Sequence, residues 1–314
     1  MITFGPVPSR RLGRSLGLNI LPSKVCTYAC IYCQVGPTRS MRIAPQPFIA
    51  PEAVCRQVQE RLQETDNAGE TVDAITIVPD GEPTLDAALG EHLSRLHTFG
   101  RTCAVITNAS LIWQQDVREQ LAQADWVSLK IDAVDEKIWH QINRPHGMLR
   151  LAEILKGARE FAAMYDGTLV TETMLVKGIN DSEVHMNQLA EYVAQINPRT
   201  AYLSIPTRPP SEKWVCPPDE ETINRAYQIV ASHAEHVELL IGYEGNAFAS
   251  TGDPVQDLLN ITAVHPMREE AVQALLDKTG SDWSVVKNLT KNKSLAKVQY
   301  RGETYYTRKT EIQP

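Results

Sequence analysis

The chain has 314 residues, 43% hydrophobic and 22% charged, a composition typical of a folded globular protein and unlike that of disordered or fibrous chains. No run approaches the roughly 18 apolar residues of a membrane span, and the basic start MITFGPVPSRRLGRS has no apolar signal-peptide core. Six cysteines are too few for a disulfide scaffold. We therefore expect a cytoplasmic protein with no membrane partner.

Charge is unevenly distributed along the chain, although the net charge is only −7. Residues 1–51 contain six Lys or Arg residues and no acidic one, with Arg10, Arg11 and Arg14 close together. This basic segment either lies beside a site for an anion or forms a solvated arm across the fold. We favour the first, because the segment immediately precedes the cysteine motif described below. A wholly basic nucleic-acid-binding surface is excluded.

Short β-like runs alternate with amphipathic stretches as far as residue 241. The expected strands are 16–21, 73–78, 102–107, 126–131, 168–176, 201–205 and 237–241, and the expected helices are 51–63, 85–98, 113–123, 151–165, 182–195 and 218–234. This alternation predicts an α/β fold with a parallel sheet. Six such units fit a partial (β/α)6 TIM-like barrel over residues 1–245, with functional residues at the carboxyl ends of the strands.

The pattern changes after residue 245. We expect a linker over 246–266, followed over 267–314 by two short helices and a hairpin that turns at Arg301–Gly302. This order is typical of a small winged-helix-like domain. Such a domain either contacts nucleic acid or packs against protein, and the mild positive charge of the segment leaves both uses open.

Three cysteines lie within eight residues, directly after a predicted strand. Cys26, Cys30 and Cys33 form the pattern CxxxCxxC. Three thiolates on one loop hold three irons of a cubane cluster and leave the fourth iron open to a small molecule. Zinc is the alternative, but a structural zinc site needs a fourth nearby Cys or His, and the nearest histidine is His92. The spacing therefore favours an iron–sulfur cluster.

The motif, with the aromatic Tyr32 just before its last cysteine, resembles that of the radical S-adenosylmethionine (SAM) superfamily. The resemblance implies a [4Fe–4S] cluster held by Cys26, Cys30 and Cys33, with SAM bound at the open iron near Tyr32. It also implies an electron donor such as flavodoxin or ferredoxin. Reduction would cleave SAM to methionine and a 5′-deoxyadenosyl radical that abstracts hydrogen from a substrate, while the protein orients the cofactor.

Two further strand ends match the superfamily in the expected order. The turn Asp80-Gly81-Glu82-Pro83-Thr84 is similar to its GE motif, which implies that Gly81 and Glu82 receive the ammonium group of SAM. The strand AVITNAS ends in a sequence similar to a TNG-type strand end, with Ala109 in place of the usual glycine. Asn108 is therefore a further candidate for a SAM contact.

The strand 126–132 has a polar face. Alternation places Ser128, Lys130 and Asp132 opposite an apolar face. In a barrel the polar face meets the lumen, so Ser128 and Asp132 are candidate SAM contacts. The alternative is an internal ion pair between Lys130 and Asp132 with no catalytic role. Later strand ends offer Glu172, Ser204 and Arg208 as candidate substrate contacts.

The opening FGPVPSRRLGRSLGLNI and the late segment NITAVHPM resemble the radical SAM branch grouped with tRNA wyosine synthase. This resemblance implies RNA as a candidate substrate, although no cysteine precedes Cys26 to hold that branch's second cluster. A peptide or small metabolite is the alternative substrate. The hypothesis from another class is a non-catalytic iron–sulfur redox sensor with a nucleic-acid-binding tail. The GE-like turn argues against a sensor, and no catalytic residue can be assigned from the sequence.

Overall fold

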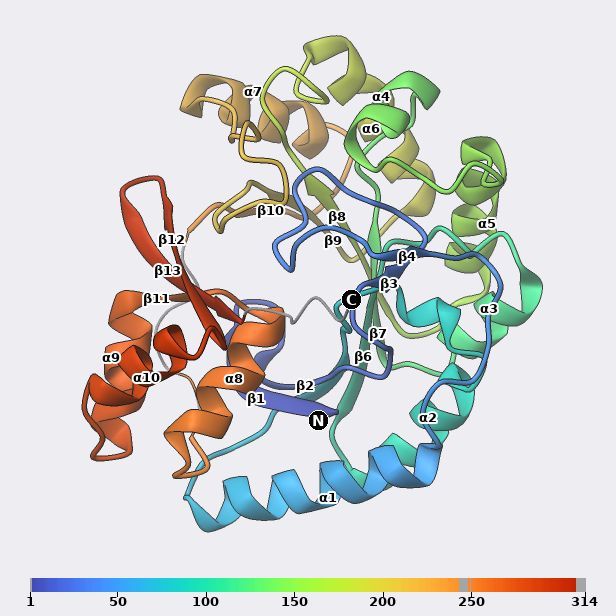
Figure 1. Ribbon diagram of the computed structural model, residues 1–314. Coiled ribbons are helices and arrows are strands. Elements are labelled where there is room, and N and C mark those ends of the chain that lie inside the picture. Colours follow the sequence, from blue (N-terminus) through green and yellow to red (C-terminus); the bar gives the residue numbers. More distant parts are fainter. Residues whose placement is uncertain (1, 243–247, 249, 309–314) are drawn as a thin grey trace.

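The computed structural model describes residues 2–242, 248 and 250–308. Its centre is a curved eight-stranded sheet in the order β1-β2-β5-β6-β7-β8-β9-β10, with helices around its convex side (Figure 1). The strands are β1 (Thr3–Ser9), β2 (Gly13–Leu18), β5 (Ala74–Ile77), β6 (Thr102–Thr107), β7 (Trp126–Lys130), β8 (Thr168–Met174), β9 (Thr200–Ser204) and β10 (Val237–Leu240). All neighbours are parallel except β1 and β2. The partial TIM-like barrel is confirmed.

The outer helices begin where the sequence supplies capping groups. The side chains of Asp135, Ser182 and Asp219 each accept a backbone N–H from the first turn of the helix that follows, which satisfies one of its free donors. The helices of the barrel are α1 (Pro51–Asn67), η1 (Pro83–Leu85), α2 (Leu89–Leu96), η2 (His97–Phe99), α3 (Gln115–Leu121), α4 (Glu136–Ile142), α5 (Leu151–Met164), α6 (Glu183–Ile196) and α7 (Glu220–Ala231).

The sheet has apolar residues on both faces. Side chains between the sheet and the helices form the main core. On the concave face a smaller apolar cluster fills the lower part of the lumen, formed by Ala104, Trp126, Val170, Tyr202 and Leu240. Arg11 lies against this cluster, with its guanidinium 5.9 Å from the ring centres of Trp126 and Tyr202.

The basic start of the chain forms a β-hairpin. β1 pairs antiparallel with β2, so the expected strand 16–21 begins earlier, at Gly13, and has a partner that the sequence did not predict. Arg10 and Arg11 lie in the turn between the strands and line the lumen. The interpretation of this segment as a solvated arm is therefore wrong.

The C-terminal part has its own small core and a three-stranded sheet. Its elements are α8 (Pro254–Val264), β11 (Met267–Arg268), α9 (Glu269–Lys278), α10 (Ser284–Lys291), β12 (Leu295–Tyr300) and β13 (Glu303–Arg308). The turn at Arg301–Gly302 is confirmed. The expected linker over 246–266 is wrong for its second half, because α8 lies there and packs Leu258 and Ile261 into the C-terminal core. The winged-helix class of this part stays a prediction.

The C-terminal part packs on the barrel at two places. The hydroxyls of Tyr300 and Tyr305 donate to the carbonyls of Pro206 (2.9 Å) and Thr207 (2.8 Å), in the loop after β9. Buried Arg61 of α1 donates to the Gly5 carbonyl of β1 and to Asp257 of α8, and α8 runs beside β1 (Figure 1). The C-terminal part therefore contacts the barrel near β1 and at the loop after β9. Each helix among the residues that the structure describes is too short or too polar to span a lipid bilayer.

Candidate active site

The three motif cysteines lie on the loop after β2, above the carboxyl ends of the strands. The loop begins at the short strand β3 (Val25–Cys26), which pairs with β4 (Ser40–Met41). Its backbone is fixed against the end of α4, where the N–H groups of Ala29 and Ile31 donate to Asn143 and Ile142. All three cysteines are half-buried. The loop therefore holds three thiols on a packed base with one side open.

Amide groups from two other segments point at these sulfur atoms. Asn108 Nδ2 lies 3.6 Å from Cys26 Sγ, and Asn143 Nδ2 lies 3.4 Å from Cys30 Sγ. Burial raises the pKa of all three thiols, that of Cys26 to about 12. The thiols are therefore protonated at neutral pH until a metal displaces the protons. Donors aimed at sulfur stabilise the thiolates of an iron–sulfur cluster, so this set of residues fits a [4Fe–4S] cluster.

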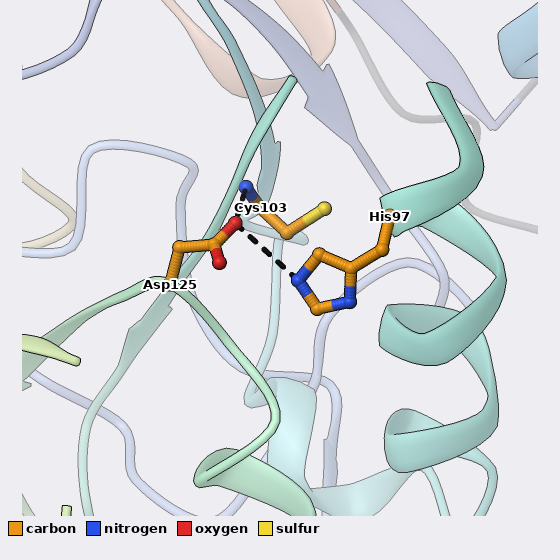
Figure 2. A group of neighbouring side chains, drawn as sticks. All are labelled: His97, Cys103 and Asp125. Atoms are coloured by element: carbon orange, nitrogen blue, oxygen red, sulfur yellow. Dashed lines mark hydrogen bonds and ion pairs between the residues drawn. The ribbon is translucent and has the colours of Figure 1, made fainter. Parts of the chain in front are cut away.

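A single metal ion fits another place better. In the part of the chain that the structure describes, three His, Cys or carboxylate ligand atoms lie within 4.8 Å of one another at His97, Cys103 and Asp125, and not at the motif cysteines (Figure 2). A zinc ion would draw its ligands together around one point, whereas the irons of a cubane are separate ions. The geometry of the motif therefore disfavours zinc.

The group in Figure 2 has a structural explanation. Asp125 Oδ2 accepts the backbone N–H of Cys103 at 2.7 Å and lies 3.3 Å from His97 Nε2. Burial raises the pKa of the Cys103 thiol to about 12. These contacts join η2, the start of β6 and the segment before β7, at the end of the sheet away from the cysteine loop. We assign them to stability of the fold.

The turn at Gly81 and Glu82 packs directly beneath the cysteine loop. A Cβ atom at Gly81 would lie 1.9 Å from the Val25 carbonyl oxygen, and the Glu82 N–H donates to the same carbonyl at 3.3 Å. Only glycine fits this approach of two backbones. The two motifs predicted from separate parts of the sequence therefore share one contact.

The carboxylate of Glu82 is buried and already has four donors. It accepts the N–H and hydroxyl of Thr84, the hydroxyl of Thr107 and the N–H of Asn108, at 2.5 to 3.1 Å. Burial raises its pKa, and these hydrogen bonds oppose the rise. The side chain thus ties the Gly81 turn to the end of β6, and what this turn offers to a ligand is its backbone.

Asn108 faces the cysteine loop. Its Nδ2 donates to Thr27 Oγ1 at 2.9 Å, and Ser110 Oγ lies 2.7 Å from the same hydroxyl. Ala109 has a φ of 61°, the left-handed conformation that glycine favours. The backbone therefore turns as a TNG-type strand end would, although this chain has alanine there.

Tyr32, Asp132 and Asn143 form a buried group behind the loop. The Tyr32 hydroxyl donates to Asp132, which also accepts Asn143 Nδ2 at 2.8 Å and the Met174 N–H at 2.9 Å. Asp132 therefore holds both Tyr32 and the amide that points at Cys30. The alternative interpretation of this strand, an internal ion pair between Lys130 and Asp132, is wrong, because Lys130 Nζ binds Glu172 instead, at 3.0 Å.

The lumen contains a charged network beneath this group. Lys130 and Arg11 both pair with Glu172, and Ser204 Oγ donates to it at 3.2 Å. Lys130 also lies 5.0 Å from the centre of the Tyr32 ring, a cation–π contact. Ser128 is fully buried lower on β7 and does not line the lumen cavity. Of the polar face predicted for this strand, Lys130 is the residue that reaches the cavity.

The network predicts a pH-dependent contribution to stability. Burial opposes ionisation of Glu172, but Lys130 and Arg11 outweigh it and lower its pKa to about 2. Because folding lowers this pKa, the stabilisation is complete above the unfolded value and lost as pH falls toward 2. We expect Glu172→Gln to lower the free energy of unfolding by about 3 kcal/mol at pH 7. The difference in free energy of unfolding between the wild type and this variant should disappear below pH 4. Urea titrations of cluster-free protein at several pH values measure it. The control is Glu153→Gln, because Glu153 is exposed on α5. This substitution should change the free energy of unfolding little at either pH.

Three site residues escaped prediction from the sequence. Thr27 anchors Asn108, and Asn143 reaches Cys30. Lys24 is buried with Nζ 3.9 Å from Asp80 Oδ2, and its charge favours the Cys33 thiolate. Thr27 lies within the cysteine motif and Lys24 lies two residues before it, and this proximity was a usable signal. Asn143 had no comparable signal, because its contact depends on how α4 packs.

Residues 20–190 match the Radical SAM superfamily. UPF0026 protein MJ1312 of Methanocaldococcus jannaschii is 43% identical over 97% of this chain and 95% of its own length. The structure of Streptococcus suis SuiB bound to SAM covers 80% of this chain and 57% of its own with a TM-score of 0.55 at 16% identity. That of TYW1 with a lysine-pyruvate adduct covers 94% and 80% with a TM-score of 0.47 at 16% identity. The chain belongs to the UPF0026 family of the radical SAM superfamily, and it is an enzyme whose cofactors are a [4Fe–4S] cluster and SAM.

Proposed function

We propose that Cys26, Cys30 and Cys33 are the cluster ligands and that the enzyme abstracts hydrogen from a substrate held in the barrel lumen. When both are bound, the reduced cluster would supply the electron that cleaves SAM to methionine and a 5′-deoxyadenosyl radical. The observation that carries this proposal is the meeting of the cysteine loop, the Gly81 turn and Asn108 above the lumen. Membership of an enzyme superfamily argues against the redox sensor.

The residues around the loop have distinct roles in this proposal. Asn108 and Asn143 donate to sulfur. The backbone of Gly81 and Glu82 offers acceptors to the SAM ammonium group, while the Glu82 carboxylate fixes that backbone. Asp132 and Tyr32 are positioning residues, because their polar groups bind one another. Ser128 has no described hydrogen-bond partner, and its burial below the cavity removes it from our set of SAM contacts.

The test is anaerobic. Reconstituted protein, SAM and dithionite should yield 5′-deoxyadenosine, measured by chromatography. Flavodoxin or ferredoxin should replace dithionite as the electron donor. A reconstituted protein with full iron content that releases no 5′-deoxyadenosine under either reductant would contradict the proposal.

We further propose RNA as the substrate, supported by a groove on the C-terminal part. The groove has a volume of about 390 Å³ and lies between α10 and the β12–β13 hairpin. Lys287, Lys291 and Lys297 are exposed along it, and Trp283 and Tyr306 form its apolar side. Lysines with adjoining aromatic rings are suited to phosphates and bases of a nucleic acid.

A binding experiment tests the RNA proposal. We expect Lys287→Gln and Lys291→Gln together to weaken binding of total tRNA at least about tenfold and to lower the dependence of log K on log salt by roughly two. Lys156→Gln with Lys137→Gln, on barrel helices α5 and α4, is the matched control. Equal binding by both double variants would favour the peptide or small-metabolite alternative.

A further inference from the structure

Lys24 is a buried cation at the base of the cysteine loop. It lies two residues before Cys26, and its side chain is only 6% exposed. Its Nζ atom lies 3.9 Å from Asp80 Oδ2 and has no hydrogen-bond partner among the residues that the structure describes. Removing an ammonium group from water costs free energy unless it is paired and hydrogen-bonded. Stability of the fold therefore does not explain why lysine is present at this position.

Asp80 does not depend on Lys24 for its hydrogen bonds. Its Oδ1 atom accepts Asn19 Nδ2 at 3.1 Å, and its Oδ2 atom accepts the hydroxyl of Ser23 at 2.8 Å. Neutral donors thus serve both oxygens of this carboxylate, and the ammonium group lies beyond hydrogen-bond distance. A buried ion pair with this geometry contributes little to stability.

The backbone fixes Lys24 in place. Its φ is 63°, in the left-handed region that glycine favours. Its carbonyl accepts the N–H groups of Arg39 at 3.0 Å and Ser40 at 3.2 Å, at the start of β4. A residue is held in such a conformation only when its surroundings impose it, and residues of this kind occur often at functional sites. The position of this charge relative to the cysteine loop is therefore set by the fold.

Lys24 and Asp80 act on the cysteines with opposite sign. Burial raises the pKa of the Cys33 thiol, Lys24 opposes this rise, and Asp80 adds to it. Lys24 also attracts the thiolate of Cys26. Reduction adds one negative charge to a cluster that already has three thiolate ligands, so a nearby cation favours reduction and a nearby anion opposes it.

We propose that Lys24, opposed by Asp80, raises the reduction potential of the cluster held by Cys26, Cys30 and Cys33. The inference rests on the proposed function and deepens it, because it names the residue that makes the cluster easier to reduce. One electron passes from dithionite, flavodoxin or ferredoxin to the oxidised cluster, and the donor is oxidised. No covalent bond forms or breaks in this step. Lys24 exchanges no proton and acts through its charge.

The experiment is an anaerobic redox titration of reconstituted protein without SAM, followed by electron paramagnetic resonance of the reduced cluster. Lys24→Met keeps an unbranched side chain but removes the charge. It should lower the equilibrium constant for one-electron reduction about tenfold, which moves the midpoint potential about 59 mV lower. Asp80→Asn should raise the constant by a similar factor. Lys156→Gln, at a lysine 72% exposed on α5, is the control and should match the wild type.

The opposite signs of the two shifts separate an effect of charge from structural damage. A wild-type midpoint in Lys24→Met, or shifts of Lys24→Met and Asp80→Asn in the same direction, overturns the proposal. Should Lys24→Met hold no cluster, Lys24→Gln replaces it, and an unchanged midpoint in Lys24→Gln or in Asp80→Asn overturns the proposal. Wild-type protein without a reducible cluster rejects the proposed function and this inference with it. A titratable cluster with unshifted midpoints rejects this inference alone.

Discussion

Cys30→Ala protein should contain no intact cluster and release no 5′-deoxyadenosine after anaerobic reconstitution. Cys30 is the middle cysteine of the motif, and its sulfur receives the Asn143 amide at 3.4 Å. Alanine provides no ligand for iron, and loss of one of three thiolates leaves a cubane with two protein ligands. We expect SAM cleavage to fall at least about 100-fold, a loss of roughly 3 kcal/mol in barrier lowering. Iron and sulfide analysis with product chromatography measures both effects.

The matched control for Cys30 is Cys216→Ala. Cys216 is exposed and outside the motif, so its replacement should leave cluster content and cleavage at wild-type levels. A Cys30→Ala protein that retained a full complement of iron and sulfide would show that the ligand set is wrong. Loss of the cluster in both variants would point to general instability instead.

Gly81→Ala should disrupt the site without removing any polar group. The new Cβ would lie 1.9 Å from the Val25 carbonyl oxygen, which is a backbone atom and cannot rotate away as a side chain could. Either the Gly81 turn or β3 must move, and β3 contains Cys26. Overpacking of this kind costs about 3 kcal/mol of folding stability. We expect lower cluster occupancy and SAM binding weakened at least about tenfold, measured by iron analysis and equilibrium dialysis.

Gly147→Ala separates the clash at Gly81 from a general effect of replacing glycine. No atom lies within 4 Å of a Cβ at Gly147, and its φ is not positive. The variant should therefore fold and bind SAM like the wild type. Normal cluster occupancy and SAM affinity in Gly81→Ala would mean that the contact between the two motifs does not position the cofactor.

Local patterns predicted the parts of the fold that depend on nearby residues. The cysteine spacing and the six β/α units are such features, and β6 begins and ends as expected. β1 was missed because Pro6 and Pro8 argue against a strand, although an edge strand tolerates proline. α8 was missed because its buried face packs on distant elements, even though Asp253 and Pro254 form a usual helix start.

The contacts within the site were harder to predict than the fold, because they join residues of different strands. Lys130 and Glu172 are direct partners in the register of β7 with β8, and the sequence does not specify that register. The nearby Asp132 was therefore the natural but incorrect partner. The role of Glu82 was likewise hidden, because two of its four donors come from Thr107 and Asn108 at the end of β6. Spacing identified the loops, and packing determined their contacts.

The anchoring of the β12–β13 hairpin has a thermodynamic consequence. Tyr300 and Tyr305 bind the carbonyls of Pro206 and Thr207, just before Arg208 in the lumen. The same hairpin contributes Lys297 and Tyr306 to the outer groove. A macromolecule that shifts the hairpin would therefore shift a cavity guanidinium. We expect the two sites to be linked, so that each occupant changes the affinity for the other by the same factor.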